Sequence, residues 1–313
     1  MAANPQILSD LHNYVFEKIG RPVTGGNPPT GGDGKKPTDK NARIPLPDYN
    51  DLKSRGKYAT AVKEKYKLPS GYGDTFLHLN EVPDTRTDSL TSKQIALKAA
   101  KIANIPAPLL HASSMVEGMS GLYPYGKNQD VDFSGNEKFP VSGYVNFGLD
   151  TFADAYPGLV KKGYLPADFN KQFVKSVHPA RQGDNKVPVN SANFSSAEAA
   201  LSAKAAMLRD AQDQVTAYAT KNKIPLSENA KHFFTLAQYN GGPGAVQVLL
   251  NDFKREGTLA NDAFLTKKPT NSKKGQVYDN VMQRFQLANA LTSEGHFDPD
   301  APSQITSTPI TDK

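Results

Sequence analysis

The chain has 313 residues, of which 38% are hydrophobic, and a formal net charge of +6, which suits one sizeable globular domain with smaller appendages. It contains no cysteine, so disulfides and thiolate metal sites are excluded, and no stretch approaches the roughly eighteen consecutive apolar residues that predict a membrane span. The modest positive charge favours a polyanionic partner, for which nucleic acid, a membrane surface and an acidic cell-wall polymer are the candidates.

The N-terminal region predicts a docking element on a tether. Residues 1–20 place apolar side chains at helical spacing and end in a glycine, which predicts a short amphipathic helix that needs a partner. Residues 21–43 are rich in Gly, Pro and charge and predict a flexible linker. The first residues have neither the basic leader nor the unbroken apolar run of a Sec signal peptide, so we expect no such signal.

Hydrophobic periodicity predicts helices through most of the remaining chain. Residues 44–90 predict a helical extension with two short helices, which end near Gly56 and Leu68. A denser helical region, 91–292, predicts the main domain. Its expected helices are 92–105, 109–120, 150–160, 166–176, 196–221, 228–239, 243–256 and 275–291.

Little of the chain predicts strand. Alternation of apolar and polar residues is nearly absent, apart from a short ribbon expected around 128–147. Residues 293–313 are polar and rich in Pro, Ser and Thr, which predicts a disordered tail. The pattern therefore predicts a mainly α protein with a small helical N-terminal extension.

Glu117 stands out near the end of the helix expected over 109–120. Its neighbours on the same helix face are small residues, including Ser113 and Ser114. Its carboxylate is therefore expected to stand on a bare ridge that another molecule can approach. With apolar neighbours in sequence and no nearby Lys or Arg, such a glutamate is expected to hold its proton near neutral pH, as a general acid must. A helix-end glutamate that only caps or is solvated is the alternative.

A second unusual stretch, Tyr-Asn-Gly-Gly-Pro-Gly at 239–244, joins two expected helices. Its proline fits the first turn of the second helix, and its first two glycines let the backbone reverse with positive φ. Gly244 is not needed for the turn, which favours close approach of another molecule to the backbone. Tyr239 and Asn240 add an aromatic ring and an amide, groups that bind sugars. A plain tight corner between helices is the alternative.

This stretch resembles a family signature. Residues 239–246 read Tyr-Asn-Gly-Gly-Pro-Gly-Ala-Val, which is similar to the Tyr-Asn-Ala-Gly-Pro-Gly-x-Val signature of the lytic transglycosylase family, the soluble-transglycosylase branch of the lysozyme superfamily. The chain departs from it at Gly241, where the family has alanine. In that family a catalytic glutamate ends a helix well before this motif, usually as Glu-Ser. Glu117 takes that place here, although Gly118 replaces the serine.

Weaker similarities cover roughly 91–292. Gly148 and Leu149 match the first half of the family's Gly-Leu-Met-Gln motif, and the second half differs. The helix expected over 195–208 resembles a core helix of the family, and residues 157–195 are longer than a minimal member needs. A later family helix is matched by Tyr278, Val281 and Phe285.

The resemblance implies a lysozyme-like catalytic domain, α+β but dominated by helix, that cleaves the β-1,4 bond between N-acetylmuramic acid and N-acetylglucosamine in peptidoglycan. Glu117 is expected to protonate the leaving oxygen and then act as base for attack by the muramic C6 hydroxyl, which leaves a 1,6-anhydro end. The expected substrate-binding residues are Tyr239, Asn240, Gly242, Gly148 and Leu149.

Two alternatives stay open. Hydrolysis of the lysozyme type requires a second carboxylate, for which Asp150 and Asp132 are candidates. Each also has a structural interpretation, Asp150 as a helix N-cap and Asp132 as part of a hydrated turn. In the second alternative, the domain is a murein-binding or structural virion module that has kept the fold and lost the catalytic activity.

The expected partners follow from the same features. Peptidoglycan glycan strands are the substrate, other virion proteins are partners through the helix at 1–20, and nucleic acid is not expected because the lysines are scattered. No metal or other cofactor is expected, since the six histidines occur singly without metal-ligand spacing. A bacteriophage member of the family fits this combination, located in the virion or, after delivery, in the host periplasm or cell wall. An endolysin and a secreted cargo are the other settings that fit.

Overall fold

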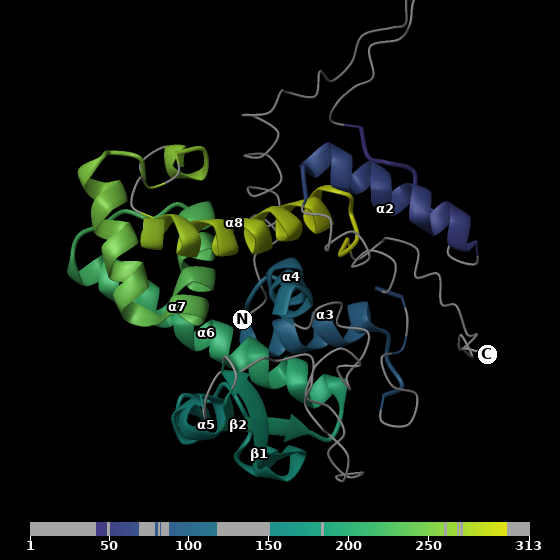
Figure 1. Ribbon diagram of the computed structural model, residues 1–313, viewed down its shortest axis with the longest axis horizontal. Coiled ribbons are helices and arrows are strands. Elements are labelled where there is room, and N and C mark those ends of the chain that lie inside the picture. The colour runs from purple at the N-terminus through teal and green to yellow at the C-terminus, as the bar shows by residue number, and fades with distance from the viewer. Residues whose placement is uncertain are drawn as a thin grey trace, which may run out of the picture.

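A computed structural model describes residues 42–48, 51–68, 79–80, 82, 88–117, 151–182, 185–259, 262–267, 269 and 272–298. Within these ranges the chain is mainly helical, which confirms the coarse prediction (Figure 1). No helix within them is both long and apolar enough to cross a bilayer. The elements are α2 Leu52–Tyr66, α3 Ser92–Ala103, α4 Ala107–Glu117, α5 Thr151–Lys161, η2 Ala167–Gln172, β1 Phe173–Gln182, β2 Asn185–Phe194, α6 Ala197–Lys221, α7 Glu228–Arg255, η3 Ala263–Leu265 and α8 Ser272–Ser293.

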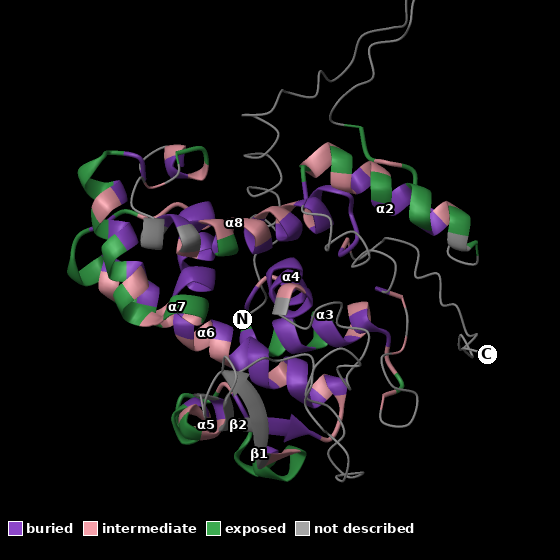
Figure 2. Ribbon diagram, in the orientation of Figure 1, coloured by how far each residue is buried: buried purple, intermediate pink, exposed green. Residues whose placement is uncertain are grey.

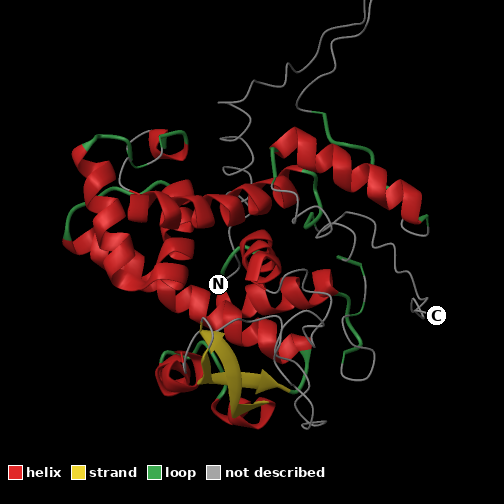
Figure 3. Cartoon of the chain, viewed as in Figure 1, coloured by secondary structure: helices red, strands yellow, loops and turns green. Residues whose placement is uncertain are grey.

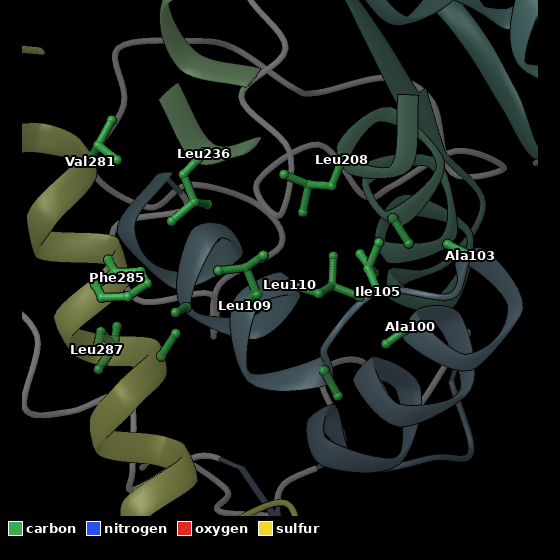
Figure 4. Packing of buried hydrophobic residues seen from close by; sticks show 14 of the residues in the cluster. Ala100, Ala103, Ile105, Leu109, Leu110, Leu208, Leu236, Val281, Phe285 and Leu287 are labelled. Carbon is green, nitrogen blue, oxygen red and sulfur yellow. The ribbon is translucent and has the colours of Figure 1, made fainter. Parts of the chain in front are cut away.

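Helix α4 lies at the centre of the hydrophobic core. It packs against α3, α6 and α8, and every residue from 109 to 115 is buried (Figure 2). In the close view of Figure 4, its Leu109 and Leu110 lie among Leu208 of α6, Leu236 of α7 and Phe285 of α8, which belong to the same core cluster. A helix that is buried on all sides depends on the surrounding helices for its stability.

The long helices α6 and α7 begin at serine caps, as their sequences favour. Ser196 accepts a hydrogen bond from the backbone N–H of Ala199, and Ser227 accepts one from that of Ala230. An aromatic cluster then fastens α7 to α8, in which the ring of Phe233 lies 5.6 Å from that of Tyr278. The periodicity of the sequence predicts hydrophobic faces for the helices 196–221, 228–239 and 243–256. These faces are buried in the structure.

The antiparallel ribbon of β1 and β2 corrects two expectations (Figure 3). A helix was predicted over 166–176, but η2 ends at Gln172 and β1 begins at Phe173. The Phe173 ring packs 5.0 Å from that of Phe152 in α5, which holds the chain in an extended path. Prolines opposite each other at 179 and 188 also disfavour helix and suit the edge strands of a two-stranded sheet. The ribbon expected at 128–147 lies outside the described residues, as does the helix expected at 1–20.

The predicted division of residues 44–68 into two helices is wrong. A single helix, α2, begins after Asp51, which accepts hydrogen bonds from the backbone of Lys53 and Ser54, and it continues through Gly56. Its buried residues, Tyr58 and Val62 among them, fall on one face, so packing against the core outweighs the lower helix propensity of the glycine. The helical extension thus shares one core with the main domain.

A polar clasp joins this N-terminal segment to the turn after α8. The Glu294 carboxylate accepts hydrogen bonds from the Ile44 backbone N–H at 2.8 Å, from Lys65 Nζ at 2.7 Å and from Tyr66 Oη at 2.7 Å. Burial and the hydrogen bond to Glu294 raise the pKa of Tyr66. The sequence had placed 293–313 in a disordered tail. This boundary is corrected, because Ser293 belongs to α8 and residues 294–297 are buried.

Two histidines are buried beside the clasp. Tyr58 Oη and His296 Nε2 are hydrogen-bonded at 2.7 Å, and the His111 ring of α4 lies 5.7 Å from that of Phe297. Burial lowers the pKa of His111 from 6.5 to about 3, and burial with nearby positive charge lowers the pKa of His296 to about 3. Both rings are therefore neutral in the fold, whereas the unfolded chain protonates them below pH 6.5.

These histidines predict that stability falls as the pH drops. A folded pKa below the unfolded value means that the stabilisation is full above about pH 6.5 and is lost toward the folded pKa, because the unfolded state binds the extra protons. The wild type is expected to lose unfolding free energy between pH 6.5 and 5. The His111→Leu variant is expected to lose about 1.5 kcal/mol less over the same range. Urea unfolding followed by circular dichroism at several pH values measures this slope. Parallel curves for the variant and the wild type would contradict the prediction.

Candidate active site

Glu117 is the last residue of α4, the buried central helix. The turn that it closes contains no basic residue, so α4 itself supplies no cation to pair with a carboxylate there. The structure describes the backbone of Glu117 but not its side chain. The hydrophobic core fixes the position of α4, so it also fixes the backbone position of the predicted acid, Glu117.

The part of the expected bare ridge that precedes Glu117 is buried, and the part that follows it, at 120 and 121, lies outside the described residues. Ser113 and Ser114 are both 0% exposed, and the Ser114 hydroxyl donates to the Leu110 carbonyl at 2.8 Å. The small side chains instead let the neighbouring helices pack closely around α4. One helix turn alone could not have revealed this, because a row of small residues suits close packing and access equally well.

The Gly-Gly-Pro-Gly corner divides α7 into two helical parts, as predicted. Gly242 has φ 68° and ψ −177°, a backbone conformation that is essentially restricted to glycine. Pro243 follows it and begins the second part, where its missing N–H costs no hydrogen bond. The local sequence, Gly242 followed by Pro243, therefore accounts for the chain reversal.

The other two glycines of the corner have different roles. The prediction of positive φ is wrong for Gly241, because only Gly242 of the two has it. An added Cβ at Gly241 would lie 2.8 Å from the Cβ of Ala245, so this glycine permits tight packing instead. At Gly244 an added Cβ would meet no atom within 4 Å. The space beside Gly244 is open, in agreement with the interpretation that this glycine is surplus to the turn.

Tyr239 and Asn240 lie on the first side of the corner. The Tyr239 ring is half-buried against the hydrophobic core, and Lys204 Nζ of α6 lies 5.1 Å from its centroid. Asn240 is exposed, and its Nδ2 donates to the Leu236 carbonyl at 2.8 Å. That hydrogen bond orients the carboxamide at the surface of the corner.

Lys204 is a residue that the sequence interpretation missed. It is 0% exposed, in a helix stretch where the surrounding alanines are buried as well. The available signal was its place in Ala-Leu-Ser-Ala-Lys-Ala-Ala, three residues after Leu201 and four before Leu208, on the apolar face of the helix. A lysine is almost never placed on such a face without a specific partner.

Of the predicted site residues, the structure describes Tyr239, Asn240 and Gly242 in full and the backbone of Glu117. Leu236, one turn before Asn240, and Leu109 of α4 belong to the same buried cluster, and their side chains point into one interior in Figure 4. The predicted Gly148, Leu149, Asp150 and Asp132 lie outside the described residues. Among the residues that are described, no group of three or more His, Asp or Glu side chains is arranged to hold a metal ion.

Comparisons of the chain with protein families, with curated proteins and with solved structures find no match. The resemblance to lytic transglycosylases therefore depends on the residues of the corner and on the position of Glu117.

The corner glycines predict opposite effects on stability. Gly242→Ala is expected to lower the unfolding free energy by about 1–3 kcal/mol, because alanine rarely adopts this backbone conformation. Gly244→Ala is expected to raise it by about 0.5 kcal/mol, since the added methyl group is accommodated and alanine favours helix. Urea or thermal unfolding of the two variants measures both effects. Equal changes in the same direction would contradict the assignment of separate roles.

Proposed function

We propose that the chain is a lytic transglycosylase that cleaves the β-1,4 bond between N-acetylmuramic acid and N-acetylglucosamine in peptidoglycan. The observation that carries the proposal is the corner of α7. It combines the family-like motif, the glycine-only conformation of Gly242, open space beside Gly244 and an exposed Asn240. A lysozyme-like fold is in keeping with a domain whose described part is mainly helical and has a buried central helix and a small antiparallel ribbon.

In the proposed reaction Glu117 acts first as an acid. Its carboxyl proton passes to the glycosidic oxygen, the C1–O bond of muramic acid breaks, and positive charge develops at C1. The resulting carboxylate then takes the proton of the muramic C6 hydroxyl while the C6 oxygen bonds to C1. The products are a free 4-hydroxyl and a 1,6-anhydro end, and Glu117 regains its proton, so one carboxyl group suffices.

The corner is proposed to position the glycan. Tyr239 offers a ring face, Asn240 an amide that suits an N-acetyl group, and Gly242 and Gly244 a backbone without side chains. The Gly244→Ala variant tests this role, because a methyl group at the open surface should weaken glycan binding although it stabilises the helix. Gly148 and Leu149 are proposed to line the same site through their backbone.

The products of digestion test the reaction. Purified sacculi are incubated with the protein, and the released muropeptides are analysed by mass spectrometry. Anhydro-muropeptides, which are 18 Da lighter than the reducing products, support the proposal, as the chemistry of internal attack requires. Reducing ends would overturn it in favour of hydrolysis, with Asp150 or Asp132 as second carboxylate. No cleavage, with sacculi still bound, would identify a murein-binding module instead.

A further inference from the structure

Lys204 is one of the most deeply buried charged residues among those that the structure describes, with an exposed fraction of 0%. Asp262 and Arg55, by comparison, are 5% and 7% exposed. Removing an ammonium group from water is costly unless specific contacts compensate. A lysine buried in a helix stretch of alanines therefore needs compensating contacts.

The contact of Lys204 with Tyr239 supplies one. Its Nζ lies 5.1 Å from the centroid of the Tyr239 ring, within the distance at which a cation is attracted to an aromatic face. This attraction is stronger where water is excluded, as it is around a fully buried ammonium group. The ring is half-buried, so one part is held by the protein and another reaches the surface beside Asn240.

We infer that Lys204 is a positioning residue for glycan binding at the corner of α7, which acts by holding the Tyr239 ring in a fixed orientation. This inference rests on the proposed function. Lys204 does not touch the glycan, because it has no exposed surface. A ring that is already oriented loses less conformational freedom when a sugar packs against it, so the fixed orientation strengthens binding.

Kinetics of Lys204 variants test this role. Lys204→Met keeps the length of the side chain without its charge and is expected to raise KM for soluble glycan strands about tenfold, the size of one desolvated cation–aromatic contact. The value of kcat should not fall. Lys204→Arg restores a cation and should recover most of the wild-type KM. Lys221→Met, on an exposed part of the same helix, is the matched control and should behave as wild type.

A double-variant comparison separates positioning from general packing. If Lys204 acts through the ring, Lys204→Met has no further effect on KM in a Tyr239→Leu background. An additive increase in KM would overturn the inference, as would equal losses of kcat, affinity and stability in the single variant.

A measurement without substrate distinguishes failure of this inference from failure of the proposed function. With 3-fluorotyrosine at position 239, the fluorine resonance reports the surroundings of the ring in the free protein. Lys204→Met should shift or broaden this resonance, and Lys204→Arg should return it toward the wild-type position. An unchanged resonance in Lys204→Met overturns the inference even if the enzyme is active. A changed resonance in a protein that neither binds nor cleaves glycan strands overturns the glycan-binding role and shows that the proposed function is what fails.

Discussion

Glu117→Gln is expected to lower the rate of peptidoglycan cleavage by about 10³-fold, the contribution typical of a positioned general acid and base. Glutamine has the shape of glutamate, but it neither donates a carboxyl proton nor accepts one at the pH of the reaction. The core residues of α4 are unchanged by the substitution, so the fold should persist. Cleavage is measured by the release of soluble muropeptides from sacculi, and folding by circular dichroism and thermal unfolding.

Glu64→Gln is the matched control for this experiment. Glu64 lies on the exposed face of α2, so the same chemical change there should leave both cleavage and stability unaltered. Glu117→Gln should also still bind sacculi, because the corner of α7 is intact. Wild-type cleavage by Glu117→Gln would remove Glu117 from the mechanism. Loss of cleavage together with loss of the fold would assign it a structural role instead.

The second large effect is expected at the clasp. Glu294→Ala should lower the unfolding free energy by about 3 kcal/mol, at the lower end of the range for breaking a buried ion pair. The Glu294 side chain is fully buried and that of Lys65 is 21% exposed, so the lysine can recover part of its hydration. The backbone N–H of Ile44 and the hydroxyl of Tyr66 also lose their acceptor. Urea unfolding at pH 7 measures the change.

The neighbouring pair of Arg43 and Asp298 offers a matched control. Their side chains lie 2.9 Å apart but are 48% and 45% exposed, and exposed pairs contribute about 0–1 kcal/mol. Asp298→Ala should therefore change the unfolding free energy by less than about 1 kcal/mol. Similar losses in both variants would show that the depth of burial does not govern the strength of the clasp.

Local sequence was sufficient for most helices and for the reversal in α7. The spacing of apolar residues predicted α3, α5, α6 and α8 to within a few residues, because these helices bury one face and the pattern repeats with the helix period. The corner was predicted because a glycine with positive φ followed by a proline has few conformational choices. Its structural role in the fold does not depend on distant residues.

The ribbon of β1 and β2 needed the tertiary structure. Phe173 was assigned to a helix from its local neighbours, but its side chain packs with Phe152 and Phe194, which come from other parts of the chain. Such contacts stabilise the strand more than helix propensity opposes it, because helix propensity differs little among these residues. The single helix α2 arises in the same way, since its packing face overrides Gly56.

Local sequence predicts the mainly helical fold and the glycine corner at 241–244, and it supplies Glu117 and the Tyr239–Asn240 pair as candidates for a glycan site. The surroundings of these residues depend on the tertiary structure. Burial of Ser113 and Ser114, the contact of Lys204 with Tyr239 and the three hydrogen bonds of Glu294 all join segments far apart in the chain. The physical reason is that periodicity and turn chemistry act within a few residues, whereas burial and the pairing of buried charges depend on which helices meet.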